Sequence, residues 1–264
     1  MNFKGVFQRI EKLIKLVYYS KNWTELFIPV LKTNSLGVVI LRKGIRLASP
    51  HDHPLFRMTN EIVYNQLYTP EGFDIGPNDV VVDIGANIGI FSLYASTKTS
   101  GPIHCFEPFP ENFDFLKRNV SLNSSENIKP HNLAVSDKAG SQKLFISESS
   151  GGHLLFDHNI HGVIHNNIEI HTTTLECLMD ENSLSRIDFM KLDCEGAEGQ
   201  IIQSTSIDYL SRINKIAMEF HDNVSVIKHD EICSILTKAG FTCRVNWNGK
   251  SVFGYLFATR NQVR

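Results

Sequence analysis

The chain carries the sequence VVVDIGANIG at residues 80–89. An apolar run that leads directly into a glycine-containing turn is typical of a buried strand in a parallel sheet, followed by a helix. Gly85 and Gly89 have no β-carbon, so the turn can adopt backbone conformations closed to other residues and leave room for a ligand. The stretch therefore predicts an α/β domain with a ligand site at the carboxyl ends of its strands.

Strand-like and helical segments alternate on both sides of this turn. Strands are expected at residues 80–84, 103–106, 129–135, 187–192, 215–220, 241–247 and 252–259, with helices from residue 88 and over 110–123. Such alternation predicts a Rossmann-like α/β fold, a mostly parallel sheet with helices on both faces. Residues 149–167 are rich in Gly, His and Asn, and we expect an irregular insertion near the mouth of the site. The histidines of the insertion match no familiar set of metal ligands.

Residues 1–77 are expected to form an N-terminal extension of helix, hairpin and helix, and residues 78–264 the ligand-binding domain. The hairpin is predicted over 36–48 and the second helix over 58–68. The first segment has apolar residues at helical spacing with lysines and an arginine among them. We expect this helix to pack on its own domain or on a second copy in a homo-oligomer, and a helix lying on a membrane surface is the alternative.

Composition excludes several classes of partner. Lys and Arg number 26 against 28 Asp and Glu, so the formal charge is −2 and a nucleic-acid partner is not expected. The chain contains no apolar run of about 18 residues, so stable membrane insertion is not expected either. The five cysteines form no CxxC pair, which indicates reduced thiols and a cytoplasmic protein.

The turn departs from the G-x-G-x-x-G pattern of dinucleotide-binding proteins, because Asn87 stands where the second glycine would be. This argues against a nucleotide-dependent oxidoreductase. Asp83 precedes the turn, and Glu107 follows Gly89 by 18 positions, where a carboxylate can bind both hydroxyls of a ribose. Glu107 alone suits NAD and S-adenosylmethionine equally, but S-adenosylmethionine carries two cationic groups and no phosphate.

Four motifs occur in order: DIGANIG at 83–89, FEP at 106–108, AVSD at 134–137 and KLDCEGAE at 191–198. With them the chain resembles the FkbM family of methyltransferases over about residues 78–221. The resemblance implies the seven-stranded class I methyltransferase fold and S-adenosylmethionine as cofactor. It also implies methylation of a hydroxyl on a sugar, a glycan or a natural product, and hence a small-molecule or glycan acceptor.

The same resemblance implies roles for individual residues. It places Asp83, Gly85, Asn87 and Gly89 around the methionine half of the cofactor, Glu107 at the ribose, and Ser136 and Asp137 at the border of the adenine. Where the family usually has Val or Ile between the Asp and Glu of its last motif, this chain has Cys194.

Catalytic groups are expected where the strands 187–192 and 215–220 end, because carboxyl ends of parallel strands meet at one edge of the sheet. We predict that Asp193 contacts the cofactor or the acceptor hydroxyl and that His221 acts as base, since an imidazole titrates near neutrality. No metal is predicted, although Asp193, Glu219 and His221 could instead hold a divalent metal. Lys191 and Glu195 could also form a purely structural ion pair.

Two other functions compete with this interpretation. A methyltransferase acting on nucleic-acid bases is disfavoured by the acidic charge balance and by the absence of an Asn-Pro-Pro-aromatic tetrapeptide. A catalytically silent module that binds the cofactor or a glycan has the same sequence pattern, because fold and motifs do not establish turnover.

Overall fold

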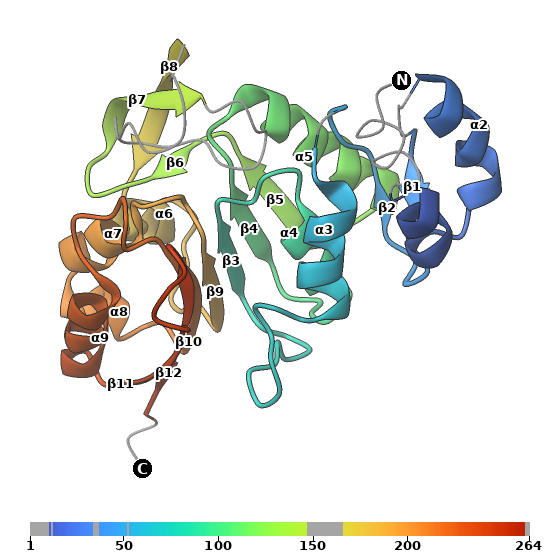
Figure 1. Cartoon of the computed structure of the whole chain (residues 1–264). Coiled ribbons are helices and arrows are strands. Elements are labelled where there is room, and N and C mark those ends of the chain that lie inside the picture. Colours follow the sequence, from blue (N-terminus) through green and yellow to red (C-terminus); the bar gives the residue numbers. More distant parts are fainter. Residues whose placement is uncertain (1–10, 12, 34–36, 52, 147–165, 262–264) are drawn as a thin grey trace.

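The structure is a computed structural model that describes residues 11, 13–33, 37–51, 53–146 and 166–261. In this part of the chain, seven strands form a central sheet with the order β11-β12-β10-β9-β3-β4-β5 (Figure 1). The strands are β3 (Val81–Ile84), β4 (Ile103–Phe106), β5 (Ile128–His131), β9 (Phe189–Leu192), β10 (Lys215–Phe220), β11 (Phe241–Asn246) and β12 (Gly254–Arg260). β12 is antiparallel to both β10 and β11, and the other neighbours are parallel. The predicted α/β fold is confirmed.

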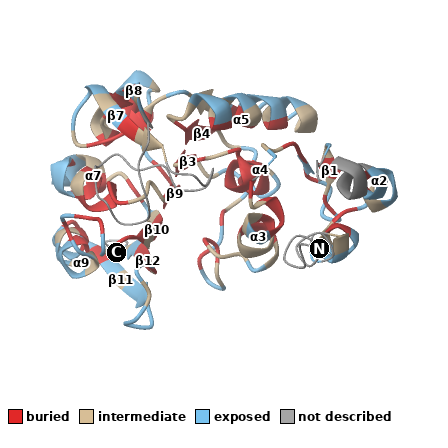
Figure 2. Cartoon of the chain, turned by 45° about the horizontal axis from the view of Figure 1, so that its top comes forward, coloured by how far each residue is buried: buried red, intermediate tan, exposed pale blue. Residues whose placement is uncertain are grey.

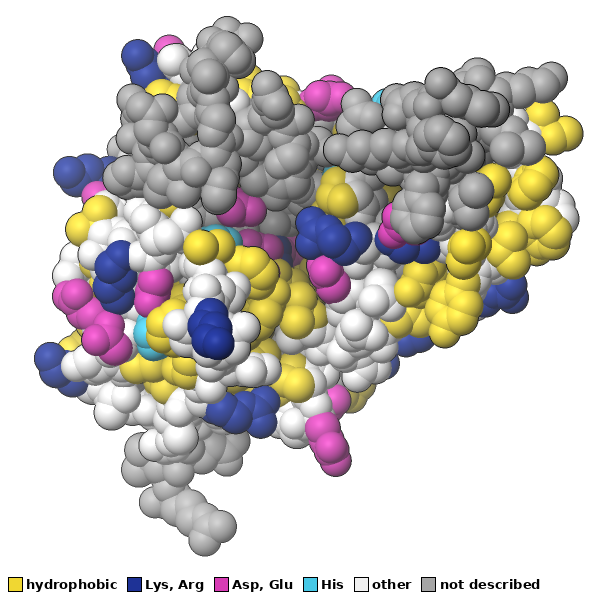
Figure 3. Space-filling model, in the orientation of Figure 1, with side chains coloured by type: hydrophobic (Ala, Val, Ile, Leu, Met, Phe, Trp, Pro, Cys, Tyr) yellow, Lys and Arg dark blue, Asp and Glu magenta, His cyan; other side chains and the backbone are white. Residues whose placement is uncertain are grey.

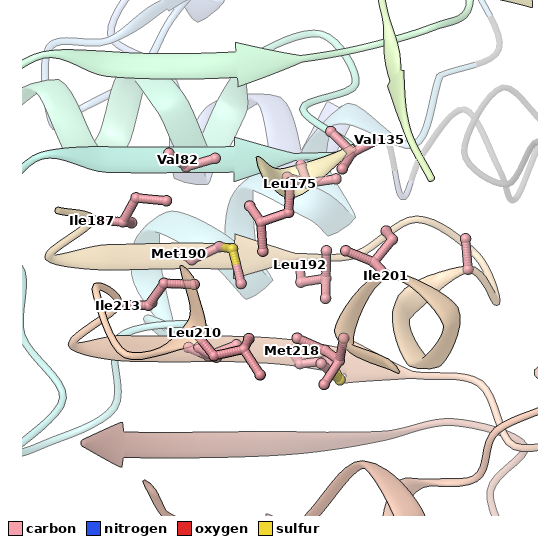
Figure 4. Packing of buried hydrophobic residues seen from close by; sticks show 14 of the residues in the cluster. Val82, Val135, Leu175, Ile187, Met190, Leu192, Ile201, Leu210, Ile213 and Met218 are labelled. Atoms are coloured by element: carbon pink, nitrogen blue, oxygen red, sulfur yellow. The ribbon is translucent and has the colours of Figure 1, made fainter. Parts of the chain in front are cut away.

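Helices cover both faces of this sheet. They are α4 (Ile90–Ser96), α5 (Pro110–Asn123), α6 (Leu175–Glu181), α7 (Glu198–Ser204), α8 (Ile207–Leu210) and α9 (His229–Lys238). Successive strand residues point to opposite faces, so Val81 belongs to a hydrophobic cluster with residues of α4 and α5, while Val82 belongs to a second cluster with residues of α6 to α9. Figure 4 shows Val82, Met190 and Met218 on the second face, and Figure 2 shows buried residues on α4 and α7. Burial on both faces explains why these strands are apolar throughout.

A second, smaller sheet was not predicted. It has the order β6-β8-β7 and consists of β6 (Ala134–Val135), β7 (Gly140–Ile146) and β8 (Asn166–Thr173). The strand predicted over 129–135 is therefore wrong, because the chain leaves the large sheet after His131. Asn132 explains the break, since its side-chain amide donates to the backbone oxygens of Glu107 and Pro108. Of the insertion predicted at 149–167, residues 149–165 lie outside the described residues, and Asn166 and Asn167 begin β8.

The N-terminal extension contains a helical segment at residues 13–19, α2 (Trp23–Thr33), β1 (Val39–Ile40), β2 (Arg46–Leu47), α3 (Leu55–Thr59) and the π-helix η1 (Asn60–Tyr64). β1 and β2 pair antiparallel, which confirms the predicted hairpin. The helix predicted over 58–68 is displaced: α3 begins at Leu55, and η1 ends before Gln66, whose φ of 54° is not helical.

The extension shares a hydrophobic core with the large sheet. The ring of Phe73 lies 5.4 Å from that of Phe189 in β9 and 5.3 Å from that of Phe257 in β12. These contacts bury aromatic surface at the face that α4 and α5 leave open. The extension therefore completes the domain's core.

The helical segment at residues 13–19 buries only one of its faces against the rest of the protein. Leu16 is fully buried, whereas Ile14 is 64% and Tyr18 68% exposed. Figure 3 shows hydrophobic side chains gathered at this end of the molecule. Among the described helices, none has the length and the apolar character needed to cross a bilayer.

The turn after β3 lies against the chain that leaves β9. The backbone N–H of Asp193 donates to the oxygen of Ile84. A β-carbon on Gly85 would lie 1.7 Å from the backbone oxygen of Asp193, and Gly85 has a φ of 76°. Only glycine permits both the conformation and the close approach at this position.

We expect Gly85→Ala to lower the free energy of unfolding by more than about 3 kcal/mol, because backbone must move to accommodate the methyl group. Gly72→Ala is the matched control, since Gly72 has a φ of 79° but no atom within 4 Å of its virtual β-carbon. The control should lose only about 1–2 kcal/mol from the left-handed conformation. Urea unfolding of both variants measures the difference, and equal losses would contradict the close contact with Asp193.

Candidate active site

A cleft opens at the carboxyl ends of β3, β4, β9 and β10, and it encloses about 1120 Å³, part of it open to solvent. Backbone of the glycine turn, acidic side chains and apolar side chains all line it. In Figure 3 acidic side chains gather at a hollow near the centre of the face shown. The extension contributes Arg57, Met58, Glu61 and Tyr68 to its wall.

A buried ion pair joins the two central strands beneath the cleft. Lys191 Nζ lies 3.2 Å from Asp83 Oδ1 and donates to the backbone oxygen of Gly85 at 2.7 Å. Ser92 donates to the other Asp83 oxygen at 2.6 Å. Burial opposes the charge of Lys191, but the carboxylates of Asp83 and Asp193 outweigh it and raise its pKa above the ordinary value. Among the described ion pairs Lys191 has none with Glu195, so the alternative pairing suggested by the sequence is not observed.

Asp193 faces the cleft and is oriented by a residue of the extension. Tyr68 donates from its hydroxyl to Asp193 Oδ2 at 2.8 Å, and the same hydroxyl lies 3.2 Å from Glu219 Oε2. Burial and the neighbouring carboxylates raise the pKa of Tyr68 well above its usual value, so the hydroxyl keeps its proton. Sequence reasoning missed Tyr68, because nothing in the local sequence links it to a partner 125 positions away.

His221 lies among carboxylates at the end of β10. Its Nδ1 is 3.2 Å from Glu198 Oε1, and its Nε2 is 3.4 Å from Glu195 Oε2 and 3.6 Å from Glu219 Oε1. Burial lowers the pKa of the imidazole, but the carboxylates outweigh burial and raise it to about 12. A protonated ring has no electron pair with which to accept a proton. His221 also lies outside the described lining of the cleft, so its role as base stays a prediction.

Glu198, the last residue of the KLDCEGAE motif, binds the backbone of the preceding loop. This fully buried side chain accepts hydrogen bonds from the backbone N–H of Cys194 at 3.1 Å and of Gly196 at 3.0 Å. It thereby holds the loop after β9 in a conformation with positive φ at Glu195 (56°) and Gly196 (110°). Burial raises the pKa of Glu195 to about 8.

Glu107 directly follows β4 and lines the cleft. Its Oε2 accepts from the backbone N–H of Asn87 at 2.8 Å, and its Oε1 accepts from Phe109 at 2.9 Å. Burial raises the pKa of Glu107 to about 7, although the two backbone hydrogen bonds oppose the shift. Each carboxylate oxygen can accept a further hydrogen bond from a ligand hydroxyl.

The other residues expected at the cofactor divide into two groups. Gly85 and Asn87 line the cleft, and their contact with the methionine half of the cofactor stays a prediction. Asp83 is fully buried in its ion pair with Lys191, and Gly89 begins α4 with a φ of 87°, so both lie behind the lining. These two residues stabilise the conformation of the turn and do not line the cleft.

Ser136 and Asp137 also lie outside the described lining of the cleft. The hydroxyl of Ser136, which is buried, donates to Asp137 Oδ1 at 3.1 Å. The preceding residues of the same motif, Ala134 and Val135, face the cleft instead. These two residues, which directly precede Ser136, give this part of the cleft an apolar surface. The role of Ser136 and Asp137 at the adenine stays a prediction.

The cleft fits the groups of S-adenosylmethionine. Its acidic end suits the ammonium and sulfonium, Glu107 suits the ribose, and an apolar end with Leu133 and Leu144 suits an adenine ring. Asn112 lines the cleft, is 2% exposed, and has a buried Oδ1 that accepts no hydrogen bond from the described residues. A buried acceptor of this kind is costly unless a ligand donates to it.

A family model for the methyltransferase FkbM domain matches residues 83–243, more than half of the chain. The chain belongs to the FkbM methyltransferase family. It is therefore a methyltransferase with S-adenosylmethionine as cofactor, and its large sheet is that of the class I methyltransferase fold.

This FkbM methyltransferase is similar to several characterised proteins. It is 28% identical to 31-O-demethyl-FK506 methyltransferase FkbM from Streptomyces tacrolimicus over 69% of the chain and 80% of that protein. It is 23% identical to Methyltransferase 1 from Beauveria bassiana over 66% of the chain and 79% of that protein. It is 26% identical to hexuronic acid methyltransferase AglP from Haloferax volcanii, over 56% of the chain and 58% of that protein.

The buried carboxyl of Glu107 makes stability depend on pH in the cofactor-free methyltransferase. Because its pKa rises from 4.5 to about 7 on folding, its stabilising contribution is present below pH 4.5 and is lost as the pH rises to 7. Relative to Glu107→Gln, the wild type should lose on the order of 3 kcal/mol of unfolding free energy across this range. Urea unfolding between pH 4.5 and 7.5 measures this loss, with the exposed Glu111→Gln as control. Parallel stability curves for wild type and Glu107→Gln would contradict the assignment.

Proposed function

We propose that this methyltransferase acts on oxygen, transferring a methyl group to a hydroxyl of a sugar, a glycan or a natural product. The relative from Streptomyces tacrolimicus is a 31-O-demethyl-FK506 methyltransferase, and the one from Haloferax volcanii is a hexuronic acid methyltransferase. Both names favour an oxygen-bearing acceptor. The formal charge of −2 favours a small-molecule or glycan acceptor over a nucleic acid. The composition also favours a cytoplasmic location.

The observation that carries this proposal is the position of Asp193. Its side chain is 22% exposed in a cleft whose other acidic groups are more deeply buried or engaged elsewhere. Its backbone oxygen touches the glycine turn at Gly85. An acceptor hydroxyl bound to Asp193 would therefore lie beside the methionine end of the cofactor site, which is the alignment that methyl transfer requires.

The residues of the cleft can supply what an oxygen nucleophile lacks. The cofactor provides a methyl group activated by the positive charge of its sulfur. Asp193 accepts a hydrogen bond from the acceptor hydroxyl and receives its proton as the new carbon–oxygen bond forms. Tyr68 keeps the carboxylate in place by donating to Oδ2. Lys191 lies 3.6 Å from the same oxygen and places a positive charge beside the carboxylate.

Cofactor binding is expected to depend on Glu107. Calorimetric titration with S-adenosylhomocysteine should show saturable binding, whereas NAD under the same conditions should show none. Glu107→Ala should weaken this binding by about tenfold or more, because hydrogen bonds to a charged group contribute about 1.5–3 kcal/mol. Glu111→Ala removes an exposed carboxylate from the same region and should bind normally. Equal affinity of Glu107→Ala and wild type would refute the ribose assignment.

Asp193→Asn should slow methyl transfer and leave cofactor binding within about threefold of the wild type. The amide keeps the size of the side chain but cannot receive a proton, and loss of a general base costs about 10²–10⁴ in kcat. The assay follows S-adenosylhomocysteine formation with a panel of glycans and polyols. Asp208→Asn, an exposed substitution in α8, is the control. Cofactor binding without turnover on any hydroxyl acceptor would instead support a silent binding module.

A further inference from the structure

We propose that Asp193, Glu219 and His221 form a divalent-cation site at the carboxyl edge of β9 and β10. One ligand atom from each residue lies within 4.8 Å of the other two. Asp193 and Glu219 also line the cleft, so an ion held by them would face the acceptor. The proposal deepens the proposed function and rests on it, because it assigns the ion to the acceptor hydroxyl.

The spacing of these groups suits an ion. Ligands bound at about 2.0–2.2 Å lie roughly 3–4.4 Å from one another. His221 Nε2 and Glu219 Oε1 are 3.6 Å apart, too far for a strong hydrogen bond but within the range for two ligands of one ion. Small rotations of the Asp193 and Glu219 side chains would bring all three ligand atoms to bonding distance.

A separate observation concerns the other side of the imidazole ring. His221 is 7% exposed, and its Nδ1 lies 3.2 Å from Glu198 Oε1. Glu198 is itself fully buried and held by the backbone N–H of Gly196. A histidine whose Nδ1 donates to a fixed carboxylate turns Nε2 toward an incoming ion, which is the usual arrangement behind a metal-bound histidine. The ion would take the place of the proton that Nε2 carries in the metal-free chain. Glu198 thus orients His221 toward the space between Glu195 and Glu219.

Charge at this edge also favours a cation. The carboxylates of Asp193, Glu195, Glu198 and Glu219 surround a single imidazole. The neighbouring ammonium of Lys191 is already paired with Asp83. Tyr68 and Lys191 both approach Asp193 at Oδ2, so their contacts leave Oδ1 for an ion.

The ligand set indicates the kind of ion and its effect. Two carboxylates and one imidazole suit Mg²⁺, Mn²⁺, Fe²⁺ or Zn²⁺ and offer nothing to a thiophilic metal. Three protein ligands leave coordination positions open to the cleft. A hydroxyl bound there has a lowered pKa, so Asp193 and the ion would act on the same proton.

The test is Mn²⁺ binding to the metal-free full chain, followed by electron paramagnetic resonance with and without S-adenosylhomocysteine. We expect one Mn²⁺ per chain in the wild type. Glu219→Gln and His221→Gln should each weaken binding by about tenfold or more. His229→Gln is the matched control, because His229 pairs with Asp222 at 2.6 Å near the same strand end without belonging to the set. Its Mn²⁺ affinity should equal that of the wild type.

Nitrogen NMR of histidine-labelled wild type adds a readout that needs no substitution. Zn²⁺ should shift Nε2 of His221 to the position of a metal-bound nitrogen and leave its Nδ1 protonated. An Nε2 that stays protonated, or Mn²⁺ binding that His229→Gln weakens as much as His221→Gln does, would overturn the site. Cofactor binding and hydroxyl methylation without any Mn²⁺ binding would overturn the proposed cation site and leave the proposed function in place. Mn²⁺ binding without methylation of any hydroxyl would instead count against the proposed function.

Discussion

The ion pair between Asp83 and Lys191 is the interaction on which the site depends. The two residues are register partners on the neighbouring strands β3 and β9, and both side chains are almost fully buried. Loss of either partner would leave an uncompensated charge in the core, which typically costs 3–5 kcal/mol. The same ammonium group holds the carbonyl of Gly85 and lies near Asp193, so one cation joins the glycine turn to the end of β9.

This arrangement explains why the two aspartates Asp83 and Asp193 differ in their surroundings. Asp83 is fully buried behind the glycine turn, whereas Asp193 follows the end of β9 and lines the cleft, where it can contact a substrate. The contact between the Asp193 backbone and Gly85 fixes the distance between the glycine turn and the chain after β9. In the proposed function this fixed distance lowers the entropy that must be lost when the reactants are aligned.

The extension contributes to the wall of the cleft. Its Tyr68 crosses from the end of η1 to Asp193 and Glu219, and its ring packs against Phe91 of α4 and Tyr255 of β12. Because the ring is packed between α4 and β12, the hydroxyl cannot be moved without disturbing the core. The acceptor side of the cleft therefore depends on a segment outside the family's sequence motifs.

Carboxylates concentrated at the ends of β9 and β10 are the other constraint. Glu195 and Glu219 have raised pKa values because burial disfavours their charge, and His221 offsets part of that cost. Concentrations of buried, like-charged groups are unfavourable for stability and are typical of functional sites. The fully buried Glu198 belongs to the same cluster but also has a structural role, because it holds the backbone of the loop.

The sequence by itself determined the strands of the large sheet, the helix over 110–123 and the turn at Gly85, because apolar runs and glycines act locally. It also placed Glu107 and Asp193 at strand ends, and motifs at strand ends meet at one edge of a parallel sheet. Only the tertiary structure decided that the 129–135 segment divides between two sheets and that Ser136 and Asp137 lie outside the cleft lining. It alone brought Tyr68 to Asp193. Those outcomes depend on contacts between residues far apart in the chain, which packing selects and no local pattern encodes.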